Sequence, residues 1–185
     1  MAWVIDGAHS EIQFSAKHLI ISTVRRRFNT FTSTIDADEN NPTTATVDVH
    51  IDASSLVTGE ERRDTHLCSS DFLDVEKYPY LTFKSTRVER SDEIHGKLYG
   101  ELTIRDITKP VVLSVEYAGQ AKTPWGTTSA GFNAQTRINR KDWDLNWNVA
   151  LETGGWLVGD TITINIELEL VKQVEQPHQA DAVAT

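Results

Sequence analysis

The chain has 185 residues, which is enough for one sizeable domain built around a single hydrophobic core. Its 27 acidic and 18 basic residues give a formal net charge of −9, the wrong sign for gripping phosphate backbones, so we expect no nucleic-acid partner. The balance of 39% hydrophobic and 24% charged residues excludes wholesale disorder, collagen and coiled coil.

Cysteine usage and the chain ends add further expectations. Cys68 is the single cysteine, so an internal disulfide is excluded, and no Cys/His zinc pattern exists. We therefore expect no metal and no cofactor. The first residues show no signal-peptide pattern, which predicts a cytoplasmic protein. No run approaches the roughly 20 apolar residues of a membrane-spanning helix, so we expect no transmembrane segment.

The first part of the chain alternates between apolar and polar residues with a period of two. Between His9 and His18, Ile12, Phe14, Ala16 and His18 share one face, as expected for a half-buried strand. The same pattern predicts three further strands, at Val24–Ile35, Ala45–Ile51 and Leu81–Val88.

A helical insert is expected where this alternation stops, between residues 53 and 78. Ser54, Ser55, Ser69 and Ser70 are helix-capping residues, and Glu60–Leu67 carries helix formers. One or two short helices therefore belong between the third and fourth strands.

Alternation resumes in the second half of the chain. It predicts strands at Glu93–Arg105, Val111–Gly119, Thr127–Asn139 and Asp160–Lys172. In the first of these, Gly96 and Gly100 lie on the apolar face, where missing side chains favour strong coiling or a close approach by another group. Eight or nine strands are predicted in total.

These elements predict an all-β fold, an extended antiparallel up-and-down barrel with about eight strands and a short helical insert. Turn signals between successive strands favour sequential pairing, and closing the meander removes its exposed edges. A barrel of this size has an interior that side chains either fill or leave open for one slender ligand. The barrel is expected over 1–172, followed by a flexible tail over 173–185.

Several segments, in this order, resemble the YceI family of lipocalin-like proteins. They span nearly all of residues 3–171 and comprise Asp6–Ser10 with Phe14 and Lys17–Leu19; Arg62–Leu67; Ser70–Pro79 with Leu81–Phe83; Gly100–Arg105 with Thr108–Val111; and Ile138–Trp143. The chain departs from the family pattern at Arg26-Arg27, where a Gly is common between Arg25 and Phe28, and at Asp106, also commonly Gly.

The resemblance implies a barrel that binds a polyisoprenoid lipid, such as a prenyl quinone or prenyl pyrophosphate, with its tail in the lumen and without catalysis. Sequestration or transport of this lipid is the leading hypothesis. An isoprenoid- or lipid-modifying enzyme that uses His18, and a stress-related scaffold barrel with a filled core, are the alternatives. A homodimer is left open.

We predict ligand contacts from lumen-facing and rim side chains, and we assign no catalytic residue. The predicted contacts are Phe14, His18, Phe28, Val49, Leu98, Gly100, Leu102, Ala134, Arg140, Trp143 and Ile164. Alternatives stay open for the polar members. A core histidine is the commoner explanation for His18, and Arg140 is also explained as a partner of Asp142 or Asp144.

Two further groups allow two interpretations. Arg25–Arg27 is either a solvated strand surface or a rim site for anionic oxygens, with Arg26 on the face opposite to its neighbours. His66 lies near Asp64, but residues two apart do not share a helix face, which argues against an acid–base pair.

Overall fold

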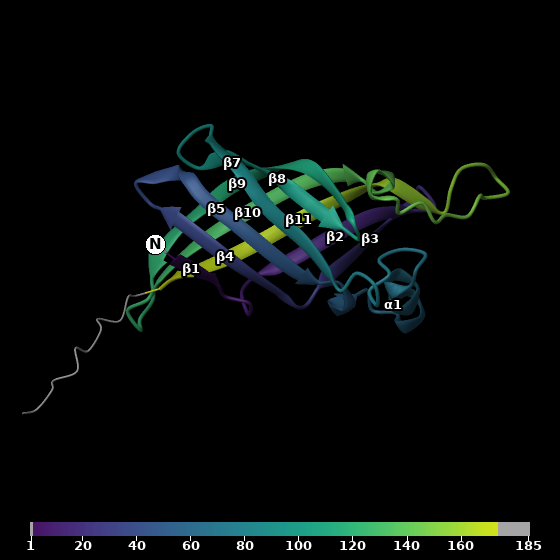
Figure 1. Cartoon of the computed structure of the whole chain (residues 1–185), viewed down its shortest axis with the longest axis horizontal. Helices are drawn as coiled ribbons and strands as arrows, with labels where there is room; N and C mark the ends of the chain where they lie inside the picture. The colour runs from purple at the N-terminus through teal and green to yellow at the C-terminus, as the bar shows by residue number, and fades with distance from the viewer. Residues whose placement is uncertain (1, 174–185) are drawn as a thin grey trace, which may run out of the picture.

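Strand pairing closes into a ring in the computed structural model, which describes residues 2–173 (Figure 1). The strands are β1 (Ala2–Ile5), β2 (Glu11–His18), β3 (Ser22–Phe28), β4 (Phe31–Asp38), β5 (Asn41–Asp52), β6 (Leu56–Val57), β7 (Tyr80–Arg90), β8 (His95–Ile104), β9 (Ile107–Lys122), β10 (Thr128–Asn139) and β11 (Val158–Lys172). The helical segments are η1 (Ala53–Ser55), α1 (Glu61–Cys68) and η2 (Arg140–Trp143).

The ring is an eight-stranded, lipocalin-like antiparallel barrel, as predicted. Its order is β1-β4-β5-β7-β8-β9-β10-β11, and it closes because β1 also pairs with β11. One edge of β11 holds two strands in succession, with β1 at Val171 and β2 along Ile162–Glu167. β3 extends the sheet beyond β2 and ends on β6. The exposed edges of a long meander are thereby largely removed.

Alternation places one face of each strand toward the barrel interior. In β11, Ile162, Ile164 and Ile166 pair with inward-facing residues of β2 and β10, so aliphatic side chains form a continuous inner wall. The tight connection from β8 to β9 uses Arg105 at φ 58°, a left-handed conformation that is uncommon for residues other than glycine.

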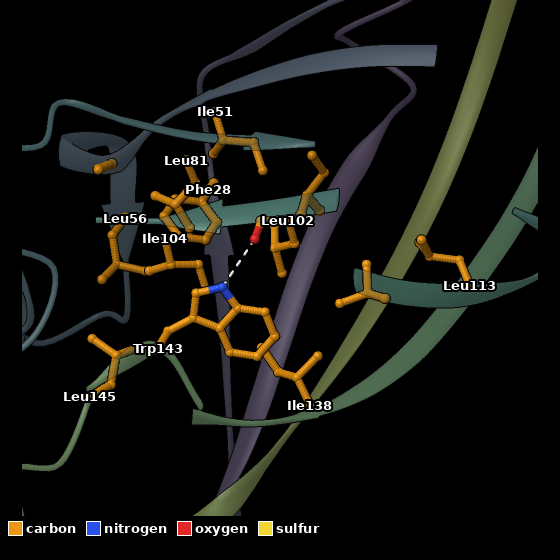
Figure 2. Packing of buried hydrophobic residues seen from close by; sticks show 13 residues of the cluster. Phe28, Ile51, Leu56, Leu81, Leu102, Ile104, Leu113, Ile138, Trp143 and Leu145 are labelled. Atoms are coloured by element: carbon orange, nitrogen blue, oxygen red, sulfur yellow. Dashed lines mark hydrogen bonds between the residues drawn. The ribbon is translucent and has the colours of Figure 1, made fainter. Parts of the chain in front are cut away.

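Two buried clusters lie along the barrel. The smaller one consists of Trp3, Ile35, Ala130 and Leu170, which are contributed by β1, β4, β10 and β11. The larger one lies toward η2, where Trp143 is 2% exposed and its indole Nε1 donates a hydrogen bond to the carbonyl of Leu102 at 3.0 Å (Figure 2). The two clusters therefore pack different parts of the barrel.

The insert between β5 and β7 contains η1, β6 and α1, which confirms the helical interruption predicted between residues 53 and 78. α1 begins after Glu60, whose carboxylate accepts a hydrogen bond from the backbone N–H of Arg62. Beyond α1, the backbone N–H groups of Leu73 and Val75 bond to the carbonyls of Leu67 and Cys68. The insert lies at the end of the barrel where β2 meets β3 (Figure 1).

Some strand boundaries differ from the predicted ones. β1 was not predicted, and the strand expected over Val24–Ile35 divides into β3 and β4. It divides because the insert competes for backbone bonds there: the N–H of Asn29 bonds to Ser55 and the carbonyl of Thr30 to Asp52. Apart from Gln173, the predicted flexible tail lies outside the described residues.

Among residues 2–173, no helix is both long and apolar enough to cross a bilayer.

We predict that Trp143 is a principal contributor to stability. Replacing a buried Trp by Ala removes packing and leaves a cavity, so W143A should lower the free energy of unfolding by about 3–5 kcal/mol. Trp125, which is 86% exposed in the β9–β10 turn, provides the control. W125A should change the free energy of unfolding by no more than about 0.5 kcal/mol. Urea unfolding followed by circular dichroism measures both, and equal effects of the two substitutions would contradict the assignment.

Candidate functional site

The middle of the barrel is hollow. A cavity of about 410 Å³ lies inside it, within the range typical of small-molecule sites. Phe14, Val49, Leu98 and Ile164 line this cavity and are only half-buried, although alternation points them inward. In a filled barrel these side chains would cover one another. Their partial exposure therefore indicates that the lumen contains open space.

The wall of the cavity is mainly aliphatic and aromatic. It combines inward-facing residues of β2, β3, β5, β7, β8, β9, β10 and β11. The rings of Phe14 and Phe28 lie 5.3 Å apart on neighbouring strands, and small residues such as Ala16 and Ala134 leave room beside them. Such a surface favours a hydrocarbon, because burying apolar groups requires no specific polar partner.

Most predicted contact residues do line this cavity, but two do not. The lining includes Phe14, His18, Phe28, Val49, Leu98, Leu102, Ala134, Arg140 and Ile164. Gly100 is excluded because a Cβ there would lie 2.4 Å from the ring of Phe83, so that ring already occupies the space. Trp143 is buried beside Leu102 in the larger cluster. Both are structural positions.

Arg140 lines the cavity, yet its guanidinium is committed to the protein. It donates to the carbonyls of Gly159, Leu145, Trp147 and Val158 and lies 3.6 Å from the carboxylate of Asp160. Burial lowers the pKa of Arg140, and Asp160 opposes that change. The side chain therefore anchors the segment after η2 to the start of β11, rather than offering free donors to a headgroup.

The polar part of the cavity lining gathers at the end where β2 and β3 meet α1. Lys17 and His18 of β2, Arg26 of β3, and Arg63 and His66 of α1 line it there. We call this polar end the mouth. The side chain of His18 is half-buried and has no hydrogen-bond partner among residues 2–173. The mouth therefore offers cationic and neutral donors above an apolar lumen.

Arg26 and Arg63 converge at the mouth. One guanidinium nitrogen of Arg26 lies 3.5 Å from the carbonyl oxygen of Thr58, which also accepts from Arg63 at 3.2 Å. Neither guanidinium forms an ion pair within the described part of the chain. Desolvation, together with repulsion from Arg63, lowers the pKa of Arg26 to about 10, although Asp64 and Glu60 oppose the shift. Two guanidinium groups without a direct ion pair therefore lie together in the lining of the mouth.

The insert supplies Arg63 because α1 is fixed against β6. The carboxylate of Asp64 accepts from the backbone N–H of Thr58, and the Nε of Arg63 donates to the hydroxyl of Thr58. Alternation had left Arg26 with two interpretations, and nothing in the sequence indicated that Arg63 would meet it. The missing information is the position of the helix relative to β3.

His66 pairs with Asp71 instead of Asp64. Its Nε2 lies 2.8 Å from the carboxylate of Asp71, and the ring packs edge-on against Trp147 at 4.5 Å and Phe72 at 5.2 Å. These contacts tie α1 to the segment after η2. The pair therefore lies where α1 packs at the mouth.

One group with metal-ligand chemistry occurs within residues 2–173, formed by Asp6, His9 and Glu169. Asp6 bonds to the N–H of Ala8 and to the ring of His9 at 2.9 Å, which stabilises the turn after β1. That hydrogen bond lowers the pKa of Asp6 and raises the pKa of His9. None of these three residues lines the cavity.

Comparison with known proteins gives a consistent assignment. A sequence model of the YceI-like domain matches residues 3–170. A UPF0312 protein of Vibrio parahaemolyticus is 42% identical over 147 residues, covering 77% of each chain. The crystal structure of a Campylobacter jejuni YCEI protein superposes with a TM-score of 0.74 at 33% identity, over 85% of this chain and 90% of that one.

A more distant structure shares the fold. It is described as a polyisoprenoid binding domain from Saccharophagus degradans and matches with a TM-score of 0.65 at 13% identity. The match covers 94% of this chain and 99% of that domain.

We predict that Arg140 acts as an anchor of the segment 144–158. R140A would leave several carbonyl groups without their donor, and loss of a buried charged partner costs on the order of 3 kcal/mol. Hydrogen exchange should therefore become faster across 144–158. Arg137 is exposed on β10, the strand that precedes η2, so R137A is the control and should leave exchange unchanged. Unchanged exchange in R140A, combined with lost ligand binding, would instead make Arg140 a ligand contact.

Proposed function

Because the chain belongs to the YceI family, we propose that it binds a long polyisoprenoid lipid in the barrel cavity and carries or sequesters it without changing it chemically. The proposal rests on one observation above all, the apolar cavity of about 410 Å³ that opens at a polar mouth. The description of the Saccharophagus degradans domain, which has the same fold, agrees with this class of ligand. Transport, a cytoplasmic location and a homodimer remain predictions.

Affinity would come mainly from the tail. Each buried CH₂ contributes about 0.8 kcal/mol, so a chain with many carbon atoms binds tightly without specific polar contacts. Inward side chains such as Phe14, Leu98 and Ile164 are partly exposed at the cavity surface, and the lipid tail would cover them. A scaffold barrel with a filled core fits this arrangement poorly.

The mouth favours an anionic headgroup over a neutral one. Arg26 and Arg63 are both cationic, both half-buried, and without an ion-pair partner among the described residues. Guanidinium groups form strong, directional hydrogen bonds with phosphate oxygens. Of the two headgroups considered, a prenyl pyrophosphate therefore matches better than a prenyl quinone, and His18 lies within the same polar end.

We predict that reducing the lumen abolishes binding. Ala134 lies on the inner face of β10 opposite Ile166, so A134W would place an indole in the space proposed for the tail. Purified protein, extracted with organic solvent and examined by mass spectrometry, should then retain little prenyl lipid.

Asn133 is the neighbouring exposed position on β10, so N133W is the matched control and should retain the lipid of the parent protein. Overpacking costs about 1–3 kcal/mol, and native circular dichroism must therefore be shown for both variants. Equal retention in folded A134W and in the parent would mean that the lipid does not occupy the lumen.

We predict that Arg26 selects the headgroup. Geranylgeranyl phosphate should bind the parent more tightly than geranylgeraniol by about tenfold or more, since a hydrogen bond to a charged group contributes about 1.5–3 kcal/mol. R26G removes the guanidinium and should remove most of this preference while geranylgeraniol still binds. R25G changes the outward neighbour and is the control. A preference that survives R26G would place the headgroup elsewhere.

A further inference from the structure

The end of the barrel that carries the mouth also carries an exposed apolar surface. Two loops form it, the β2–β3 turn and the segment between η2 and β11. Ile20 and Ile21 are 70% and 84% exposed, and Val149 and Trp156 are 46% and 56% exposed. We call these four residues the apolar tip. Figure 1 shows the second loop projecting beyond the barrel at the end where α1 lies.

The two loops form one surface. The backbone N–H of Leu19 donates to the carbonyl of Leu157 at 3.0 Å, and a Cβ on Gly155 would lie 3.2 Å from the side chain of Ile20. Trp156 forms a bridge to Ala150 within the second loop. The residues that follow, Leu157 and Val158, line the cavity. The apolar tip is therefore continuous with the mouth.

Fold stability does not explain the residue at the apex. Ile20 adopts φ 68°, a left-handed conformation that costs an L-residue roughly 1–2 kcal/mol and suits a β-branched residue poorly. Its side chain is mostly exposed, so little burial offsets this cost. An exposed isoleucine in a strained turn indicates that the apolar side chain is useful outside the fold.

The charge of the β2–β3 hairpin, which carries Ile20 and Ile21, is the reverse of that of the whole chain, whereas the second loop carries the exposed Glu152 between Val149 and Trp156. Residues 12–35 contain Lys17, Arg25, Arg26 and Arg27 but no Asp or Glu, although the protein carries 27 acidic residues. Lys17 and Arg25 are exposed and form no ion pair within residues 2–173. Arg27 lies 3.8 Å from Glu11, farther along the strands. Cations therefore flank the apolar tip on the hairpin that carries it.

We propose that the apolar tip docks on an anionic lipid bilayer, placing the mouth against the membrane so that a lipid passes between bilayer and lumen. Ile20, Ile21 and Trp156 enter the interfacial region, and Lys17 and Arg25 contact anionic headgroups. Apolar insertion combined with basic flanks is the general way in which peripheral proteins bind such surfaces. The inference rests on the proposed lipid-binding function.

The test measures vesicle binding and cargo binding separately. Full-length protein is floated with vesicles of phosphatidylcholine alone, or of phosphatidylcholine and phosphatidylglycerol in equal parts. The test variant is I21S/W156S, and the matched control is I94S/W125S, which removes the same residue types from exposed turns at the opposite end. Cargo binding is measured as equilibrium loading with geranylgeranyl phosphate from ethanol.

We expect the parent and the control to float with the anionic vesicles and to bind less as salt rises. I21S/W156S should bind those vesicles at least about tenfold more weakly, because binding strength scales with the apolar area inserted into the interface and the variant removes two apolar side chains. R25Q, which changes an exposed residue outside the cavity lining, should weaken binding to anionic vesicles only. Equilibrium loading should stay unchanged in all variants.

Other outcomes overturn the proposal in distinguishable ways. If the parent protein loads geranylgeranyl phosphate but binds neither kind of vesicle, the result contradicts membrane docking and leaves the proposed lipid-binding function intact. Loading lost in I21S/W156S would make the apolar tip part of the lipid site. A change of oligomeric state in that variant, measured by sedimentation, would assign the surface to a second copy of the chain. A parent that neither loads nor floats would remove both functions.

Discussion

Closure of the barrel depends on the way one edge of β11 is shared. β1 pairs with its final residues and β2 with the preceding stretch, so a single long strand holds two short ones end to end. β4 pairs with β1 and continues the ring. β3 pairs with β2 outside the ring, and it meets β6 only at Arg27 and Phe28. Toward the β2–β3 turn, within the described residues, the edge of β3 therefore has no strand neighbour. The mouth lies at this interruption of the wall.

The interruption brings together groups that a complete wall would separate. α1 lies beside the unpaired part of β3, and Thr58, which precedes the helix, provides the carbonyl shared by Arg26 and Arg63. Away from the mouth, the strands of the barrel pair without interruption, as β10 and β11 do, and the inner face is aliphatic. A ligand with an apolar tail and an anionic end would match this gradient, and its binding would stabilise the folded state by an amount that grows with the logarithm of its concentration above the dissociation constant.

Alternation in the sequence was sufficient to predict the inner wall, because side chains in a strand alternate faces whatever the tertiary contacts. Alternation was insufficient where contacts between residues distant in sequence determine the environment of a side chain or the end of a strand. Gly100 marks a place where space is required, but only the structure shows that Phe83 uses it. Arg140 has the chemistry of a headgroup ligand, but its carbonyl partners come from the loop after η2, which lacks periodicity, and from the start of β11. The division between β3 and β4 depends on backbone bonds from the insert.

The β2–β3 hairpin shows how period-two alternation gives one element two environments. Arg26 and His18 line the lumen, Arg25 is exposed outside the cavity lining, and Lys17 is exposed at the rim of the mouth, so neighbouring basic residues lie in different environments. The inner pair lies in a partly desolvated setting, where a charge gains most from a bound anion. The outer pair is solvated and acts through longer-range attraction that salt screens. Since the turn between the two strands carries Ile20 and Ile21, the same hairpin is apolar at its apex and basic along both faces. A carboxylate anywhere from 12 to 35 would weaken both environments, and this stretch contains none.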